Sequence, residues 1–425
     1  MRTPPSSFRL FVAAGAVLLL AAAPGAAAES AADYNAQGVQ EYNAKQWDKA
    51  VRSFESAYRL DRTNATVRRN LCNALQAQAN EFARSEDFDT AARLLAQAIT
   101  ADPENASPLV QLGSYYLHVD MNADAAARLA EAVELDPSNL DAQELLGDAY
   151  YKQNNVAAAV EQWEYVQETD PKRPGLDAKM AKAQREASVE NSFSKSASSH
   201  FEYLHKPNIN GVDLNKVLRI LERAYRDIGR KSGMYPPTPI QVSVYDAEDF
   251  EKATQLGEHV GAVYDGKIRV PIRDKSGQVL PEEELTRRLY HEYTHVVVRS
   301  WAGNNVPWWF NEGLAETFSN EVAATDIELL QEANAQGALF PLASLEQAQL
   351  KKLDPDTLHL AYRQAHATVD FLWNKYGQRG MAAMMESLRA GTSAEDALSA
   401  SYRLNYDLLQ REVAQSIGTE MAQRQ

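Results

Sequence analysis

A 34-residue period runs through the first part of the chain and constrains its fold more than any other feature. A chain with such a period stacks similar units, each of which buries its apolar face against its neighbours. The pattern is a Leu-Gly pair, a Tyr, three apolar residues and a Pro, and it occurs first as Leu112, Gly113, Tyr116, Ala125, Leu129, Ala132 and Pro137. It returns 34 residues later as Leu146, Gly147, Tyr150, Ala159, Trp163, Val166 and Pro171.

Two earlier units extend the array. One offers Phe82, Ala91, Leu95, Ala98 and Pro103 at the same shift of 34. The first offers Gly38, Ala50, Phe54 and Ala57, displaced by 41 residues from its successor, so we expect a loop seven residues longer there. A 34-residue period with small residues where helices cross is the tetratricopeptide signature. We therefore predict an all-α solenoid of four helical hairpins and a polar capping helix from Pro174 to Glu190, together covering 31–190.

The repeat residues describe packing and do not identify a ligand. A solenoid of this kind offers a concave groove that suits a peptide or a partner protein. The alternative is a rigid spacer that positions the rest of the chain. Both interpretations stay open at this point.

A second pattern, H-E-x-x-H, lies at His291, Glu292 and His295 in a run that is typical of a helix. Pro281 and the three acids after it suit a first helical turn. Imidazoles at i and i+4 project from one helix face and can share a tetrahedral Zn²⁺. Glu292 then lies beside the ligands, where it can take a proton from metal-bound water. The alternative is two surface histidines on an ordinary helix.

A third metal ligand is available downstream. Sixteen residues separate His295 from Glu312, in the segment V-P-W-W-F-N-E-G-L-A-E. Pro307 can open a helix on which Glu312 and Glu316 share a face. Glu312 completes the three-ligand set of a catalytic zinc site, and Glu316 could brace an imidazole. The alternative is that the aromatic residues are core and both glutamates are solvated.

These two motifs resemble those of the gluzincin zinc metallopeptidases, in the peptidase MA-like group. The resemblance runs from about His200 to Gly377 and includes 261–271, which is similar to that group's active-site edge strand. It implies His291, His295 and Glu312 as zinc ligands and Glu292 as the general base. The G-x-M-E-N signature of the clan's aminopeptidases is absent, which favours an endopeptidase.

The segment from Leu360 to His366 resembles the A-Y-x-Q-[SA] helix of the same group. Peptide hydrolysis by zinc needs a donor to the oxygen that becomes negative in the transition state. Tyr362 is our preferred donor and His366, at i+4 from it, is the second choice. His359 is also nearby, and both preferred residues could instead be packing residues.

Strands before the predicted zinc helix indicate an α+β, zincin-like domain at 200–425, after a Ser-rich linker at 191–199. We expect strands at Phe201–Leu204, Ile240–Tyr245 and Gly261–Ile272, and a helix at Asp213–Arg230. The rest, from Glu321 onward, is expected to be helical, with breaks near Gly377 and before Gly380 and Ala394. The chain is thus predicted to be multidomain.

The first 28 residues resemble a secretory signal. Arg2 and Arg9 precede a fourteen-residue apolar stretch that is too short to span a bilayer, and Ala26-Ala27-Ala28 suits cleavage. An uncleaved anchor is the alternative. The single cysteine, Cys72, excludes an intrachain disulfide. We expect a periplasmic or secreted protein with no membrane span after cleavage, and a net charge of −15 argues against nucleic acid as a partner.

The sequence thus predicts an exported, zinc-dependent metallopeptidase that acts on peptides or proteins, with a repeat array that recruits or positions a substrate or partner. The alternative is an interaction adaptor whose peptidase-like domain holds zinc as a structural element; the intact Glu292 argues against it, since folding around zinc needs no general base. A hydrolase acting on a non-peptide amide shares the metal chemistry.

Overall fold

A computed structural model describes residues 29–85, 87–207, 214–256, 262–303, 305–319, 324–346 and 353–424. The predicted signal at 1–28 lies outside these residues. By the density of its internal contacts the chain divides into two compact units, 1–74 and 75–425. Among the described residues, no helix has the length and apolarity needed to cross a bilayer.

The first unit holds helices α1 (Ala31–Asn43) and α2 (Trp47–Leu60) and the beginning of α3 (Ala65–Arg84). A capping box closes the start of α1, where Ser30 and Asp33 each accept from the other's backbone N–H. The two helices cross where Gly38 faces Phe54. A Cβ at Gly38 would come within 2.6 Å of the Phe54 ring, so only glycine permits this approach.

The second unit begins with the rest of the repeat array: α4 (Phe88–Ala101), α5 (Ser107–His118), α6 (Asn122–Leu135), α7 (Leu140–Lys152), α8 (Val156–Thr169) and α9 (Leu176–Glu190). A Cβ at Gly113 would meet Leu129 at 2.5 Å, and one at Gly147 would meet Trp163 at 2.4 Å. In each hairpin the large residue follows its glycine by sixteen positions, as Phe54 follows Gly38. The predicted solenoid of helical hairpins is therefore confirmed.

The seven additional residues of the first repeat do not form a loop. Helix α3 has 20 residues, whereas its counterparts α5 and α7 have 12 and 13. Seven residues are nearly two helical turns, and this part of the sequence, A-T-V-R-R-N-L-C-N-A-L, contains neither Gly nor Pro to stop a helix. The prediction of a longer loop was wrong because a helix absorbs the insertion.

A five-stranded mixed sheet follows the array, with strands β1 (Ser194–Ala197), β2 (Phe201–His205), β3 (Ile240–Tyr245), β4 (Val263–Tyr264) and β5 (Ile268–Pro271). The order is β1-β2-β3-β5-β4, in which β3 is parallel to both β2 and β5 and the outer strands are antiparallel. The segment predicted as a linker, 191–199, therefore contains an edge strand, and Lys195 on it pairs with Glu202 of β2 at 2.7 Å. The other predicted domain bounds stay a prediction.

The single strand predicted over Gly261–Ile272 is a hairpin. Gly266 turns the chain with φ +103°, between β4 and β5, and few residues other than glycine adopt that angle. The strand β5 is internal and β4 is the edge of the sheet. The sequence Asp265-Gly266 is a turn signal that the prediction of one continuous strand overlooked. Gly261 itself lies outside the described residues.

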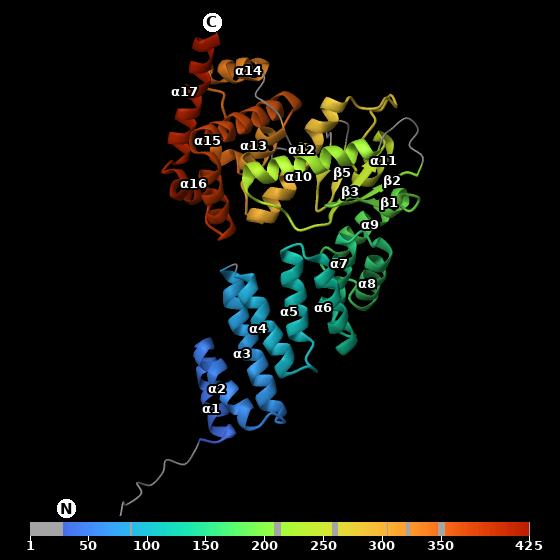
Figure 1. The fold of residues 1–425 in the computed structure, drawn as a ribbon, viewed down its shortest axis with the longest axis vertical. Helices are drawn as coiled ribbons and strands as arrows, with labels where there is room; N and C mark the ends of the chain where they lie inside the picture. The colour runs from blue at the N-terminus through green and yellow to red at the C-terminus, as the bar shows by residue number, and fades with distance from the viewer. Residues whose placement is uncertain are drawn as a thin grey trace, which may run out of the picture. The chain divides into compact units, whose positions relative to one another are not determined.

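Helices cover one face of the sheet (Figure 1). They are α10 (Leu214–Ser232) and α12 (Glu282–Ala302), whose apolar residues share one core with Tyr203, Val242 and Val270 of β2, β3 and β5. The remaining helices are α11 (Ala247–Thr254), α13 (Trp308–Ser319), α14 (Ala324–Ala335), α15 (Pro355–Arg389), α16 (Ala394–Tyr402), α17 (Tyr406–Arg424) and the 3₁₀ turn η1 (Leu342–Leu345). Helix α15 is kinked at Gly377, as its glycine predicted, with φ 62°.

The opposite face of the sheet meets α9, the last helix of the array. All six residues of β3 and all four of β5 are buried, because both faces of the sheet are covered. Arg269 projects from β5 to this face with 1% of its surface exposed, 2.9 Å from Glu186 and 3.3 Å from Glu190 of α9. Tyr151 of α7 donates to Glu186 at 2.5 Å. The helix predicted as a polar capping helix thus supplies buried carboxylates to the sheet.

This contact predicts a stability effect. Changing Glu186 to Gln keeps the side chain's shape but removes a buried carboxylate that faces both Arg269 and Lys267. We expect the free energy of unfolding to fall by about 3–5 kcal/mol, measured by urea denaturation. The control is Glu248→Gln, which breaks an exposed pair with Lys252 on α11 and should change nothing measurable. Equal stability of the two variants would contradict a structural role for the Glu186–Arg269 pair.

Candidate active site

Helix α12 holds the H-E-x-x-H residues on one face. Its first turn carries Glu282, Glu283 and Glu284, which suit the positive end of the helix dipole. Glu284 also pairs with Arg287 at 3.1 Å, along the same helix. One turn further on, the rings of His291 and His295 lie side by side with centroids 4.8 Å apart. Local helical geometry therefore suffices to bring these two imidazoles together.

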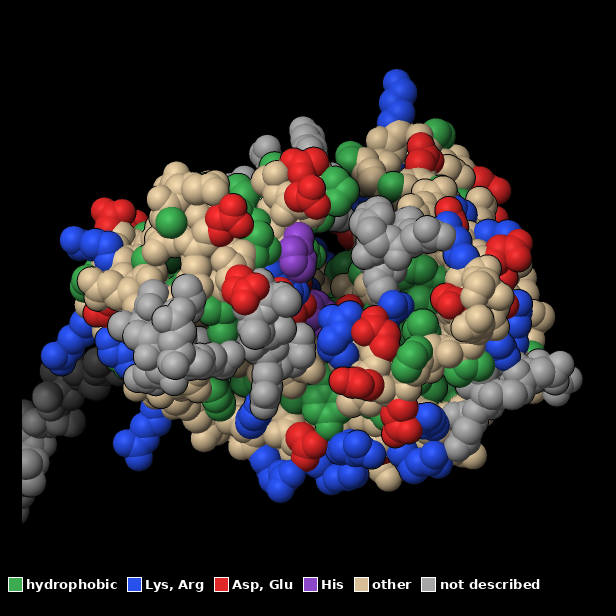
Figure 2. All heavy atoms as spheres, turned by 90° about the horizontal axis from the view of Figure 1, so that it is seen from above, with side chains coloured by type: hydrophobic (Ala, Val, Ile, Leu, Met, Phe, Trp, Pro, Cys, Tyr) green, Lys and Arg blue, Asp and Glu red, His purple; other side chains and the backbone are tan. Residues whose placement is uncertain are grey.

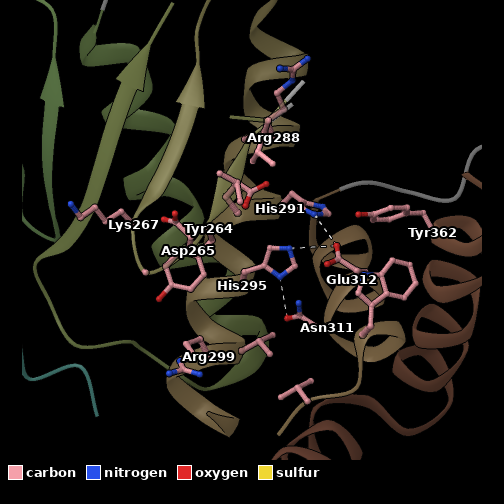
Figure 3. Close-up of a pocket in the computed structure, with 18 of the residues that line it drawn as sticks. Tyr264, Asp265, Lys267, Arg288, His291, His295, Arg299, Asn311, Glu312 and Tyr362 are labelled. Atoms are coloured by element: carbon pink, nitrogen blue, oxygen red, sulfur yellow. Dashed lines mark hydrogen bonds and ion pairs between the residues drawn. The ribbon is translucent and has the colours of Figure 1, made fainter. Parts of the chain in front are cut away.

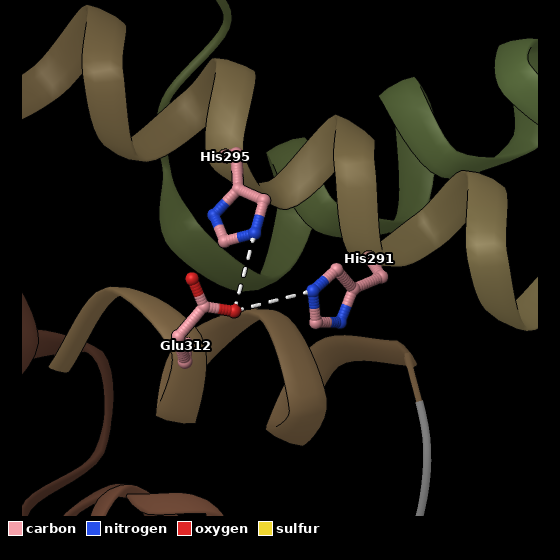
Figure 4. Close-up of side chains that lie close together, drawn as sticks. All are labelled: His291, His295 and Glu312. Atoms are coloured by element: carbon pink, nitrogen blue, oxygen red, sulfur yellow. Dashed lines mark ion pairs between the residues drawn. The ribbon is translucent and has the colours of Figure 1, made fainter. Parts of the chain in front are cut away.

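Helix α13 brings the third donor to them (Figure 4). The Oε2 atom of Glu312 lies 3.4 Å from Nε2 of His291 and 3.5 Å from Nε2 of His295. Ligand atoms about 2.0 Å from a tetrahedral zinc ion lie about 3.3 Å from one another, so both separations fit such an ion. Among the described residues these three form the group of His, Cys, Asp and Glu side chains with metal-binding geometry.

Neighbouring side chains fix the orientation of both rings. Asn311 Oδ1 lies 3.1 Å from Nδ1 of His295, and Glu316 Oε1 lies 3.3 Å from Nδ1 of His291. Each Nδ1 faces one of these oxygens, so each Nε2 is turned toward Glu312, in the direction from which a metal ion would be bound. Glu316, which the sequence suggested as a brace, thus lies against His291. Asn311 was missed, and its position directly before Glu312 was the available signal.

Arg363 extends this network behind Glu316. Its guanidinium lies 3.1 Å from Glu316 and 3.2 Å from Asp326, and all three side chains are largely buried. This role could not be predicted from the sequence, because Asp326 and Arg363 belong to different helices, α14 and α15. The result is a chain of alternating charges from Asp326 to the metal-binding group.

The electrostatics of the site follow from burial among charged groups. Burial lowers the pKa of His291, but Glu312 and Glu316 outweigh it and raise that pKa to about 10. Burial likewise opposes the ionisation of Glu316, yet His291 and Arg363 lower its pKa to about 2. The pKa of Glu312 is lowered in the same way by the two imidazoles. The donor carboxylate is therefore held in its ionised form.

Glu292 differs from the other two acids. It is buried, with 6% of its surface exposed, and burial raises the pKa of its carboxyl against the opposing charges of His291 and His295. A hydrogen bond from the backbone of Tyr264 stabilises its ionised form. A carboxyl group with a raised pKa beside a metal-binding group is suited to exchange protons.

A close approach of two helices brings α15 to the site. A Cβ at Gly313 would lie 2.5 Å from the carbonyl oxygen of Ala365 and 2.4 Å from Val369, so this glycine allows α13 and α15 to touch. Tyr362 of α15 consequently lies at the cavity with its ring 5.0 Å from that of Trp308, and it points toward His291 (Figure 3). Burial raises the pKa of its phenol, which keeps it protonated.

The other two candidate donors lie differently. His366 is 1% exposed, does not line the cavity, and neither of its ring nitrogens has a hydrogen-bond partner among the described residues. Burial lowers its pKa to about 4, so its ring is neutral. His359 lies at the cavity with half of its side chain exposed, 3.8 Å from Asp326. Of the three, Tyr362 is the donor that faces the metal-binding group.

The site opens into a cavity of about 1690 Å³. Its walls come from α12, α13 and α15, from the β4–β5 hairpin, and from repeat residues that include Tyr151, Lys152 and Lys179. Figure 2 shows histidine side chains in a hollow on this face of the molecule. Pockets for small ligands usually measure about 300–1,000 Å³, so this cavity is larger than most of them.

Fold and site together define a class: a helical repeat array followed by a domain with a two-histidine, one-carboxylate metal-binding geometry. The comparisons with known proteins agree with both parts. Residues 279–418 match the peptidase MA superfamily, and residues 77–118 and 110–174 match the tetratricopeptide repeat. The chain therefore contains a peptidase MA superfamily domain preceded by tetratricopeptide repeats, as the resemblance in the sequence implied.

Solved structures similar to this chain are tetratricopeptide proteins. The first such domain of Spaghetti, solved with an HSP90 peptide, is 22% identical over 27% of this chain and 90% of its own, with a TM-score of 0.26. The N-terminal domain of stress-induced protein-1 from C. elegans is 22% identical over 29% and 99%, with a TM-score of 0.26. YrrB is 20% identical over 36% and 76%, with a TM-score of 0.30. No curated protein matches the chain.

The donor geometry predicts the metal content. Purified protein should hold close to one zinc ion per chain, measured by mass spectrometry of the metal, because two imidazoles and one carboxylate fill three of four tetrahedral positions. His291→Ala, His295→Ala and Glu312→Ala should each lose it, and Glu316→Gln should weaken binding by about 10–100-fold.

A matched control for metal binding is His359→Ala, which removes a histidine from the same cavity but outside the donor group. It should keep its full zinc content. Retention of zinc by Glu312→Ala would remove that carboxylate from the ligand set.

Proposed function

We propose that this protein is an exported zinc metallopeptidase with a zincin-like α+β domain, and that it cleaves within polypeptide chains. The observation that carries the proposal is the convergence of His291, His295 and Glu312 beside the buried Glu292, at a cavity large enough for a polypeptide segment. Export rests on the signal-like sequence at 1–28.

The residues of this chain supply most of what the reaction requires. His291, His295 and Glu312 would hold a zinc ion, which would supply the Lewis acidity that lowers the pKa of water and polarises a carbonyl group. Glu292 accepts the proton of the attacking water and later gives it to the leaving amine. The Tyr362 hydroxyl donates a hydrogen bond to the oxygen that becomes negative.

The edge strand β4 is the proposed binding strand for the substrate. Among the described residues it pairs with β5 on one side only, so the backbone groups on its other side are available for an added strand. The backbone of Tyr264 on β4 also bonds to Glu292, so a substrate paired with β4 passes next to the proposed base. An added strand needs no free chain end, which suits an endopeptidase.

The repeat array takes part in substrate binding in this proposal. Tyr151, Lys152 and Lys179 of α7 and α9 line the same cavity as Glu292 and Tyr362. A polypeptide held in the array would therefore be presented to the site without leaving this cavity. The alternative function, an adaptor that keeps zinc as a structural element, shares the array and differs only in whether Glu292 acts as a base.

The proposed base gives the decisive test. Glu292→Gln preserves the shape of the side chain, so zinc content and melting temperature should stay close to those of wild type. Turnover of a broad peptide library should fall by about 10²–10⁴-fold, because general-base catalysis is lost. If Glu292→Gln and wild type cleave equally, or if neither cleaves any peptide, the adaptor becomes the better interpretation.

The proposed oxyanion donor is tested by removing a single hydroxyl. Tyr362→Phe should keep fold and zinc, while kcat falls by about 10²–10³-fold with KM little changed, because the contact exists only in the transition state. The comparison variant is His366→Gln, whose ring does not reach the cavity and should affect kcat much less. The opposite ranking of the two variants would move the role to His366.

A further inference from the structure

Arg299 lies on the face of α12 that carries the metal-binding histidines. It is four residues beyond His295, so its side chain leaves the helix one turn further along the same face. It lines the same cavity as His295 and Glu312. Figure 3 shows Arg299 below His295 along the helix. The cavity therefore contains a guanidinium about 6 Å, measured along the helix axis, from a proposed zinc ligand.

This guanidinium has no charge partner among the residues that the structure describes. The other cations of the cavity wall each have an acidic neighbour within 4.0 Å. The pairs are Arg287 and Arg288 with Glu284, Arg363 with Glu316, Lys152 with Asp120, Lys179 with Asp148, Lys182 with Asp265, and Lys267 with Glu186. No ion pair or hydrogen bond joins the Arg299 side chain to a described residue, although the residue is partly buried. A partly buried, unpaired charge costs stability unless a ligand completes it.

The surroundings of Arg299 are those of a binding pocket for a side chain. Val306, Trp308 and Asn311 line the cavity on the side of α13, and Tyr264 lines it on the side of the edge strand. Tyr264 and Arg299 line the same cavity, and Figure 3 shows both side chains at its wall. Arg299 thus shares this cavity with a residue of the proposed binding strand β4 and with residues of α13.

We propose that Arg299 binds a carboxylate of the substrate and makes the peptidase selective for acidic sequences. A guanidinium matches a carboxylate with two parallel hydrogen bonds. A phosphoryl group, with about twice the charge, would call for a second free cation, and the other cations of the wall are paired. The inference rests on the proposed peptidase function, because it assigns a specificity to that site.

The distance along α12 sets where the carboxylate must lie. Extended chain advances about 3.3 Å per residue, so 6 Å corresponds to about two residues. Side chains two residues apart in a strand project to the same side. The carboxylate therefore belongs to an Asp or Glu side chain about two residues from the reacting peptide bond, or to the substrate's own C-terminus at that distance.

Cleavage of matched peptides tests this specificity. In a peptide that the protein cleaves, each residue near the cleaved bond is replaced in turn by Glu and by Gln. Each of these peptides is made both with a free and with an amidated C-terminus. We expect wild type to prefer the carboxylate at one position by about 10–100-fold in kcat/KM. Preference for Glu over Gln assigns the side chain, and preference for the free acid over the amide assigns the C-terminus.

Substitution of Arg299 should abolish that preference. The Arg299→Gln variant should cleave the acidic and the neutral peptide equally, at the rate at which wild type cleaves the neutral peptide. The Arg299→Glu variant should prefer a peptide with Lys at the same position. The melting temperature of Arg299→Gln should not fall, since no partner within the protein loses its charge. The control is Arg287→Gln, one turn before His291 on the same face but paired with Glu284, and it should keep the wild-type preference.

Binding gives a readout that needs no turnover. Zinc-loaded Glu292→Gln should bind a fluorescent acidic peptide about 10–100-fold more tightly than its neutral counterpart, and adding Arg299→Gln should remove the difference. Cleavage that depends on Glu292 but shows no acidic preference, or a preference that survives Arg299→Gln, would overturn this inference and leave the proposed function intact. Equal cleavage by wild type and Glu292→Gln would instead overturn the proposed function.

Discussion

The ion pair between Arg269 and Glu186 is the contact on which the arrangement of the second unit depends. Arg269 projects from β5 into a region with almost no solvent, where its charge needs the carboxylates of α9. The same guanidinium also contacts Asp265 in the β4–β5 turn, at 3.0 Å. From there β4 leads to Tyr264, whose backbone bonds to Glu292. One buried cation therefore connects the repeat array to the proposed catalytic base.

Contacts with the repeat array also explain why β3 is buried on both faces although its residues alternate between apolar and polar. The strand β3 alternates Ile240, Val242 and Val244 with Gln241, Ser243 and Tyr245, a pattern that normally leaves one face in water. Here the polar face is covered as well: Asn154 contacts Gln241, and Tyr245 donates to Glu190. Buried hydrogen bonds of this kind specify one arrangement of their elements more narrowly than apolar packing does. The last hairpin and the capping helix α9 are thus tied to the sheet.

The sequence predicted those features that depend on short spacings. The 34-residue period defined the hairpins, because each glycine and its large partner are only sixteen residues apart. The spacing of His291 and His295 needs nothing but a helix. What the sequence did not reveal depends on residues distant along the chain: Arg269 and Glu186 are 83 positions apart, and Asp326 and Arg363 are 37 apart. The β4–β5 hairpin was missed for a different reason, because the prediction of one continuous strand included the Asp265-Gly266 turn signal.

In the cavity wall, charge pairing distinguishes the lysine and arginine side chains that have a structural role from those that can bind a ligand. A lysine or arginine held by an acid of the same chain gains little from a substrate carboxylate, because the new contact must replace an existing one. Arg363 illustrates this case, since Glu316 and Asp326 occupy its guanidinium. An unpaired guanidinium in the same wall has no contact to give up, and binding a carboxylate removes the cost of its burial. The selectivity of such a site therefore comes from the one cation that the fold leaves without a partner among the described residues.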